Sequence, residues 1–386
     1  MIGVGIASSR GRRLRARRVL VLSCSLVTSL LAACGAASAR PSAGIHGLKV
    51  CEVRSGSAAA GLDSSAQSAL TFTRSRLAST IDLQTVTTSA IGGVVHDGCR
   101  LIIAPSYQQP PSAILAAATE YPHQHFVVAD TSFHSTAPAN AENRYDFRSA
   151  RDLTRPNVSV LAFEADQPAF LAGYIAAAVS PNHVVGEYGG VSSPVVDAAL
   201  NGFLAGARAW GQDTHARVRI LGWDGTTGPF VGNDYDRTKA FAIAQGLIHS
   251  GAHVLFGVAG SASLGSAAAA EQHRSVYLVG MYVDAGIAAP QYANRWLTSV
   301  VFDMRVPILS AASQAARGQF RGGLWVGTLR NGGVGLAPFR TLQHLVPNAV
   351  VARLPSLRAQ LAQGSISTNP GDYVPTEAES SNPLDA

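Results

Sequence analysis

The chain has 386 residues, of which 47% are hydrophobic, so it is long enough and apolar enough for two ordinary packed domains. Its formal net charge is +6. Six of its 30 basic residues are arginines within residues 1–33, which contain no acid, and the remaining 24 basic residues balance 24 acidic ones. A neutral remainder of this kind gives no basic surface for nucleic acid, so a nucleic-acid-binding function is not expected.

The N-terminus has the pattern of an export signal. Arginines between positions 10 and 18 precede the apolar run VLVLSCSLVTSLLAA, which is too short for a membrane span of roughly 20 residues. The run ends in Leu31-Ala32-Ala33-Cys34, which resembles a bacterial lipobox. We therefore expect a signal peptide over 1–33, lipidation of Cys34, a tether over 34–45, and an extracytoplasmic protein anchored to the cell membrane by lipid. An ordinary signal peptide and an uncleaved anchor helix are the alternatives.

Strands and helices are predicted to alternate after the tether. Strands are expected at about 47–53, 82–86, 100–104 and 125–130, with helices after an N-cap at Asp63 and from Pro111. Such alternation predicts a parallel sheet with helices on both faces. The polar stretch 131–157 is interpreted as the first crossing between two lobes.

A second alternating run begins at VSVLAFEA, residues 158–165, and continues to RWLTSVVFD, which ends at residue 303. A helix at about 304–317 and strands near 324–328 and 333–336 follow. The predicted fold class is α/β, resembling a type I periplasmic binding protein, with two doubly wound parallel-sheet lobes and a ligand cleft between them. Lobe 1 is predicted to comprise 46–150 plus about 303–322, lobe 2 to comprise 158–302 plus about 324–363, and 364–386 to form a disordered tail.

Two cysteines follow the lipobox. Cys51 and Cys99 lie at predicted strands of the same lobe, and an exported compartment permits a disulfide between them. Two buried thiols are the alternative. No Cys/His spacing typical of a metal site occurs, so no metal or cofactor is expected, and His123 and His125 are interpreted as surface residues.

The segment HVLFGVAGSASLGSAAAA, residues 253–270, reads as a strand, a glycine loop and a helix. It is not a Walker loop, because Ser266-Ala267 follow Gly265 in place of Lys-Ser/Thr. Around Gly260 the backbone can approach a ligand closely, and Ser261 and Ser263 can add hydroxyl contacts. A tight turn with Ser261 as helix cap is the alternative.

Several segments resemble one family. FEADQPAFLAGYIAA, GAHVLFGVAGSASLGSAAAA, YLVGMYVDAG and RWLTSVVFD are similar, in order and spacing, to blocks of the basic membrane protein family of substrate-binding lipoproteins. That family includes purine nucleoside receptors of ABC transporters, and the resemblance runs from about residue 47 to 336. It implies a small-molecule ligand, such as a nucleoside, and an ABC permease as partner.

The family's ligand positions carry over unevenly. In GLDSSAQSA the resemblance places Asp63 and Gln67 at ligand positions, with Ala66 where the family has an aromatic residue. Tyr282 stands at the first aspartate position of a "GVDxDQ" motif, and Phe302 stands at a lysine position. A stacking aromatic is expected near GWDGTTGPFVGND, at Trp223 or Phe230.

Neutral polar ligands need a few well-placed hydrogen bonds and an aromatic face. A carboxylate at a strand end suits a pair of sugar hydroxyls, and Asp130 is the leading candidate for that role. Helix capping and core packing are the alternative roles for each residue. The predicted ligand-binding residues are Asp63, Gln67, Tyr107, Asp130, Trp223, Phe230, Gly260, Ser261, Asp284 and Asp303.

No motif indicates an enzyme, because neither a GxSxG elbow nor HExxH occurs. The leading interpretation is a lipid-anchored solute-binding protein that captures a small polar ligand for ABC-type import. The alternative is a surface lipoprotein that senses a ligand or binds a regulatory partner without transport.

Overall fold

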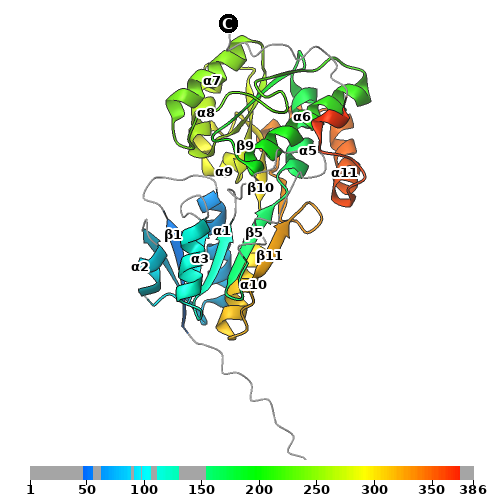
Figure 1. Ribbon diagram of the computed structural model, residues 1–386. Helices are drawn as coiled ribbons and strands as arrows, with labels where there is room; N and C mark the ends of the chain where they lie inside the picture. Colours follow the sequence, from blue (N-terminus) through cyan, green and yellow to red (C-terminus); the bar gives the residue numbers. More distant parts are fainter. Residues whose placement is uncertain are drawn as a thin grey trace, which may run out of the picture. The chain divides into compact units, whose positions relative to one another are not determined.

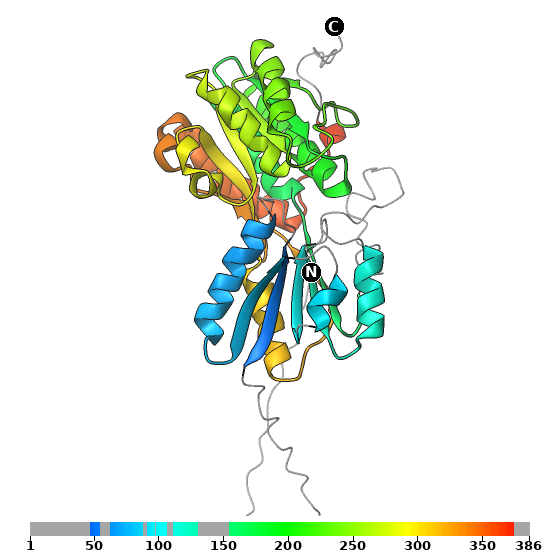
Figure 2. The ribbon, with the colours of Figure 1, turned by 90° about the vertical axis from the view of Figure 1, so that its left-hand side faces the viewer.

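The computed structural model describes residues 47–54, 62–87, 91–96, 98–105, 111–129 and 154–373. Within these ranges the strands form two sheets, each with helices on both faces (Figures 1 and 2).

The first sheet has the strand order β11-β5-β4-β3-β1-β2, and all of its pairs are parallel. Its strands are β1 (Leu48–Arg54), β2 (Ile81–Thr87), β3 (Leu101–Pro105), β4 (His125–Ala129), β5 (Val158–Phe163) and β11 (Gly323–Gly327). Although β5 and β11 are far apart in sequence, they lie side by side (Figure 1).

Alternate residues of the first sheet enter two different cores, as expected for strands covered on both faces. Leu48 and Val50 of β1 pack with α1 (Leu62–Leu77) and α10 (Arg305–Ala316). Cys51 and Val53 face the opposite side, against α2 (Ile91–His96) and α3 (Pro111–Glu120). On that side the structure joins Cys51 and Cys99 by a disulfide, with their Cα atoms 5.8 Å apart.

The second sheet has the order β12-β10-β9-β8-β6-β7. Its strands are β6 (Val184–Gly189), β7 (Arg219–Leu221), β8 (Val254–Val258), β9 (Tyr277–Tyr282), β10 (Trp296–Phe302) and β12 (Val334–Leu336). Its pairs are parallel except that β12 runs antiparallel to β10. The carboxyl ends of β6, β8 and β9 therefore meet at one edge.

Helices cover both faces of the second sheet. On one face lie α5 (Asp166–Val179) and α6 (Pro194–Thr214), with α11 (Asn348–Gln363) against α5. On the other face lie α7 (Arg237–His249) and α8 (Leu264–Glu271). The close contact of α5 with α6 depends on glycine, because a Cβ on Gly206 would be 1.9 Å from the carbonyl oxygen of Phe170.

The predicted boundary between the lobes was wrong at two strands. Both β5 and β11 belong to the first sheet, whereas 158–163 and 324–327 were assigned to the second lobe. Residues 131–153 lie outside the described residues, and the strands that precede and follow them, β4 and β5, are neighbours in one sheet. The apolar run of β5 fits either sheet, and only strand pairing, which the sequence pattern does not specify, decides between them.

Three connections consequently join the elements of the two sheets. The first runs from β5 into α5 at Phe163–Asp166, and the second from β10 into α10 at Phe302–Arg305. The third runs from β11 to β12, between Gly327 and Val334.

The predicted disordered tail was wrong for residues 364–373. Arg208 donates from Nη1 to the carbonyl oxygen of Pro370 at 2.6 Å, and the Thr368 hydroxyl donates to the carboxylate of buried Asp166. The ring of Tyr373 lies 5.8 Å from that of Phe170. These contacts attach the segment to α5 and α6, although its polar composition suggested disorder. Residues 374–386 lie outside the described residues.

Candidate ligand-binding site

The segment 222–236, which follows β7, folds back over the carboxyl end of β6. The amide of Gly189 donates to the carbonyl of Pro229 at 3.1 Å, and the amide of Val231 donates to Gly189 at 2.9 Å. The amide of Gly232 donates to Gly190 at 2.7 Å. The segment is thus attached to the sheet by main-chain hydrogen bonds, which fix its path at the edge where ligands bind in parallel α/β sheets.

Asp234, in this segment, is fixed from two sides. Its carbonyl oxygen accepts hydrogen bonds from the Ser261 hydroxyl at 2.9 Å and from the Ala262 amide at 3.0 Å. Its carboxylate lies over Gly190, because a Cβ on that glycine would be 2.1 Å from Oδ1. Gly260, with φ +52°, is also close, since a Cβ there would be 2.9 Å from the Cβ of Asp234. Side chains at either glycine would occupy the space that Asp234 takes.

The Asp234 carboxylate has no hydrogen bond or ion pair with any residue in the described ranges. Although the residue is exposed overall, the surrounding protein removes part of its hydration and raises the pKa of its carboxyl. It is therefore a positioned hydrogen-bond acceptor without a donor among the residues that the structure describes.

Tyr282, the last residue of β9, interacts electrostatically with the carboxylate of Asp234. Burial raises the pKa of its phenol strongly, and the negative charge of Asp234 raises it further. Its backbone has φ +72°, which a non-glycine residue rarely adopts. Such strain at a strand end is often associated with a binding site.

The two aromatic candidates in the segment have different roles. Trp223 is 4% exposed, and its indole N–H donates to Oδ1 of Asn201 at 2.8 Å. Phe230 is partly exposed, and its ring lies edge-on to that of Trp223 at 5.9 Å. Trp223 is thus a core residue that supports Phe230, and Phe230 is the aromatic side chain available to a ligand.

Two predicted aspartates already have partners. Asp284 caps α9 (Ala285–Ala288) by accepting from the Gly286 amide at 3.1 Å, and it forms an ion pair with Arg340. Asp303 forms an ion pair with Arg305 at 2.5 Å. Although burial opposes it, Arg305 holds the pKa of Asp303 below its usual range. Both carboxylates stabilise local structure, so they are poorer ligand candidates than Asp234.

The remaining predicted positions divide into described and undescribed residues. Asp63 was predicted to be the N-cap of α1. The helix begins one residue earlier, at Leu62, so Asp63 lies within its first turn, where it is 1% exposed. Gln67 is exposed on α1, and Gly260 and Ser261 lie at the candidate site, where the Ser261 hydroxyl holds Asp234 and does not cap α8. Cys34, Tyr107 and Asp130 lie outside the described residues.

A row of aromatic rings extends from the candidate site toward the first sheet. Tyr282 lies edge-on to Phe302 at 5.4 Å, and Phe302 stacks on Phe163 at 4.4 Å. Phe163 in turn lies edge-on to Trp325 at 5.8 Å. Phe302 and Phe163 end β10 and β5, where two of the three connections begin, so these buried rings pack the connecting region.

Glu164 follows Phe163 in the first connection. Burial, followed by the charge of Asp166, raises its pKa to about 7, and a hydrogen bond donated by Gln167 partly opposes this. Oε1 of Gln167 accepts from the amide of Leu329 at 2.8 Å, and the amide of Glu164 donates to Gly327 at 2.9 Å. The first and third connections are therefore tied together.

Sequence reasoning missed Asp234. The sequence analysis predicted only an aromatic ligand contact in this loop. In the structure Asn233 forms a turn there by accepting hydrogen bonds from the amides of Tyr235 and Asp236. The available signal was the pair of glycines, Gly190 and Gly260, that follow two strands of the same sheet. That both glycines lie against Asp234 is seen only in the folded structure.

Neither a membrane-spanning helix nor a metal centre is found among the described residues. No helix there combines the length and the apolar character needed to cross a membrane. Nowhere in those ranges do three or more His, Cys, Asp or Glu side chains gather as they do around a metal ion.

Comparison with known proteins identifies relatives. A family model described as ABC transporter substrate-binding protein PnrA-like matches residues 73–355. Basic membrane protein A of Borreliella afzelii is 27% identical over 208 residues, covering 53% of this chain and 59% of that protein. The ABC transporter nucleoside-binding protein BmpA of Lactococcus lactis subsp. cremoris is 24% identical over 238 residues, covering 58% and 60%. The matches thus span about three fifths of these relatives.

The fold has a counterpart among solved structures. An ABC transporter solute-binding protein from Aeropyrum pernix K1 aligns with a TM-score of 0.66 and 18% identity, covering 83% of this chain and 92% of that one. At this identity the likeness shows the fold alone. The predicted α/β class, with two sheets as in type I periplasmic binding proteins, is confirmed.

Proposed function

This chain belongs to the family of PnrA-like ABC transporter substrate-binding proteins, and we propose that it is a lipid-anchored extracytoplasmic protein that captures a small polar ligand, in the first place a nucleoside, for import. The name of the Lactococcus relative, which describes a nucleoside-binding protein, supports this class of ligand.

The observation that carries the proposal is the Asp234 carboxylate, which is fixed over Gly190 and has no partner in the described ranges. A carboxylate accepts two hydrogen bonds, which suits the neighbouring hydroxyls of a ribose. The exposed side of Phe230 offers an apolar face for a base. Both groups lie on one segment at the carboxyl end of β6, beside Gly189 and Gly190, and we propose that one ligand contacts both.

The remainder of the site is proposed at the carboxyl ends of the first sheet. Asp130 directly follows β4, and Tyr107 follows β3 by two residues. A ligand that contacts both sheets favours the closed arrangement of the lobes, because only differential binding shifts such an equilibrium. Gln67 on α1 is the described residue that we assign to this half, whereas the burial of Asp63 favours a structural role.

Lipid attachment at Cys34 is proposed from the Leu31-Ala32-Ala33-Cys34 motif. We expect the full chain to sediment with membranes and Cys34→Ser to appear in the soluble extracytoplasmic fraction. Equal sedimentation of both proteins would contradict lipid anchoring. An ABC permease is the proposed recipient of the ligand, and nucleoside binding without nucleoside uptake in the producing cell would favour the sensor alternative.

The ligand class is tested by calorimetry on residues 45–386, unfolded and refolded to remove bound ligand. We expect a nucleoside to bind, and we expect Asp234→Asn to weaken binding by about 10- to 100-fold, the range for hydrogen bonds to a charged group. Asp82→Asn is the matched control, because Asp82 is exposed on β2, in the other sheet. Cooperatively folded protein that binds no nucleoside would contradict the proposed ligand class.

A further inference from the structure

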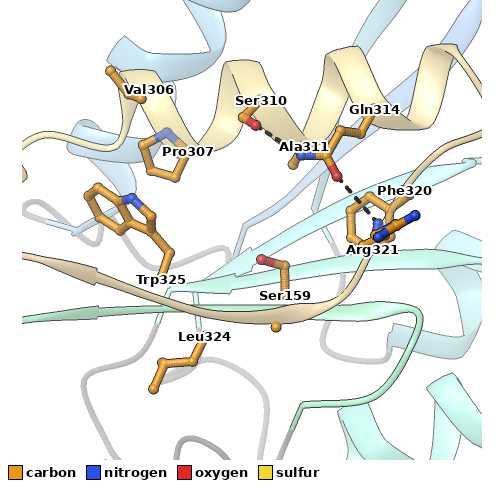
Figure 3. Close-up of a pocket in the computed structure, with 11 residues that line it drawn as sticks. Ser159, Val306, Pro307, Ser310, Ala311, Gln314, Phe320, Arg321, Leu324 and Trp325 are labelled. Atoms are coloured by element: carbon orange, nitrogen blue, oxygen red, sulfur yellow. Dashed lines mark hydrogen bonds between the residues drawn. The ribbon is translucent and has the colours of Figure 1, made fainter.

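A cavity of about 240 Å³ lies between α10 and β11, and its lining residues come from β5, α10, β11 and the turn between α10 and β11 (Figure 3). Pro307 of α10 lies above it, and Trp325 of β11 lies at one end. Ser159 of β5 and Gly323 of β11, which are partners in the parallel pairing, form its floor.

The cavity extends to the backbone of β11. A Cβ placed on Gly323 would meet no atom within 4 Å, and this glycine does not have the positive φ that excludes other residues. Figure 3 shows the Ser159 side chain directed toward α10, into the same space. The floor of the cavity is therefore open.

Two aromatic rings border the cavity, Trp325 of β11 and Phe320 of the connection before it, and each packs against a ring on a neighbouring strand. Trp325 lies edge-on to Phe163 at 5.8 Å, and Phe320 stacks on His125 at 4.4 Å. Because these contacts fix the orientation of the rings, the cavity presents a preformed apolar wall to a planar molecule.

Two polar groups of the cavity have no partner among the described residues. The exposed guanidinium of Arg321 forms no ion pair or side-chain hydrogen bond there, and neither does the Ser159 hydroxyl. The neighbouring polar groups do have partners, because Gln314 donates to Ser310 at 3.0 Å and accepts from the Arg321 amide at 3.4 Å. The unpaired groups are thus a cation and a hydroxyl.

We propose that this cavity is a second ligand site, which binds a small planar aromatic carboxylate. The ring lies against Trp325 above Gly323, and the carboxylate accepts hydrogen bonds from Arg321, whose guanidinium matches it in charge and shape. Sites for drug-sized ligands have volumes of about 300–1,000 Å³, so this cavity fits a molecule of one or two rings. The site is separate from the proposed nucleoside site and does not depend on it.

The probe for this site is 4-fluorobenzoate, titrated with the protein and followed by the width of its fluorine NMR signal. We expect the wild-type chain to bind it and Gly323→Val to bind at least tenfold more weakly, because the added side chain fills the cavity. Gly335→Val is the matched control. Gly335 lies in strand β12 of the other sheet, its nearest potential contact is 4.0 Å away, and its substitution should leave binding unchanged.

Charge recognition is tested separately. Arg321→Ala should weaken the binding of 4-fluorobenzoate at least tenfold. The uncharged analogue 4-fluorobenzyl alcohol should bind to the wild type as weakly as 4-fluorobenzoate binds to Arg321→Ala. Nucleoside binding should be the same in Gly323→Val as in the wild type, which separates this site from the first. The proposal is overturned if folded wild-type protein fails to bind 4-fluorobenzoate at millimolar concentration, or if Gly323→Val binds it with unchanged affinity.

Discussion

Oδ1 of Asp234 lies 2.1 Å from the position that a Cβ on Gly190 would occupy. The carboxylate and the glycine are therefore coupled, since residue 190 can have no side chain while Asp234 keeps its place. The Cα of Ala259 lies 2.9 Å from the same position, so the backbone of the neighbouring β8 connection also restricts it.

Gly190→Ala should therefore impair binding without removing any ligand-contacting group. We expect displacement of Asp234, a loss of nucleoside affinity of about 10- to 100-fold, and a loss of about 1–3 kcal/mol in the free energy of unfolding from overpacking. Calorimetry and urea unfolding measure the two effects. Gly93→Ala is the control, because a Cβ on that glycine meets nothing within 4 Å. Wild-type affinity in Gly190→Ala would show that the position of Asp234 does not matter.

The two aromatic residues of segment 222–236 should respond differently to substitution. Phe230→Leu removes an aromatic face, so it should lower the affinity for base-containing ligands by about 1–3 kcal/mol. Trp223→Phe removes the hydrogen bond to Asn201, so it should cost about 1–2 kcal/mol of stability and change affinity less than twofold. The same calorimetric titration serves both variants, and a larger affinity loss in Trp223→Phe would reverse these roles.

Glu164 should make stability depend on pH in a direction unusual for a carboxyl group. Its pKa is about 7 in the folded protein against an ordinary 4.5, so the folded state holds the proton more tightly than the unfolded state. The resulting stabilisation is complete below about pH 4.5 and is lost as the pH rises through about 7. The full shift corresponds to about 3.4 kcal/mol, and because solvent screens this partly buried group we expect about 1–2 kcal/mol.

Urea unfolding of the wild type and Glu164→Gln between pH 4.5 and 8 measures this contribution. The amide does not titrate, so the stability of the wild type relative to Glu164→Gln should fall as the pH rises. Other titrating groups, including His125, whose pKa is lowered by burial, are common to both proteins and cancel in the difference. A pH-independent difference would mean that Glu164 titrates normally.

The disulfide should contribute strongly to stability, because Cys51 and Cys99 are separated by 48 residues and join β1 to the segment before β3. We expect the double variant Cys51→Ala and Cys99→Ala to lose about 2–4 kcal/mol in the free energy of unfolding. Dithiothreitol should lower the Tm of the wild type and leave that of the double variant unchanged. A wild-type Tm that is insensitive to complete reduction would contradict this expectation.

Much of the fold could be predicted from the sequence, because strands covered on both faces are continuous apolar runs separated by amphipathic helices. The runs that became β1, β4, β8 and β10 were identified within a few residues of their bounds. The assignment of β5 and β11 to a sheet could not be predicted, because their side-chain patterns fit either partner. The packed segment 364–373 was missed for a related reason, since its contacts are made by backbone carbonyls and single polar side chains.

The sequence indicated some residues of the candidate site and missed others, and the ligand-binding roles of all of them stay predictions. Gly260 and Ser261 were recognised from the glycine loop, and the aromatic region around Phe230 was identified. Asp284 and Asp303 were chosen because they follow strands, yet their partners Arg340 and Arg305 occupy them. These ion pairs form because the fold brings the carboxylate and the guanidinium together, which the sequence pattern does not show. Asp234 likewise lies near Gly190 only because segment 222–236 folds back over the sheet.

The attachment of segment 222–236 to β6 is made by the backbone groups of Gly189, Gly190 and their partners. Main-chain hydrogen bonds do not depend on which side chains the segment carries, apart from the requirement for glycine beneath it. The side chains that face the ligand can therefore change by mutation while the loop keeps its path, and selection for a new solute can proceed at little cost to folding. Trp223 and Asn233 add side-chain hydrogen bonds within the loop, so the positions open to such change are those, like Phe230, whose side chains make no hydrogen bond.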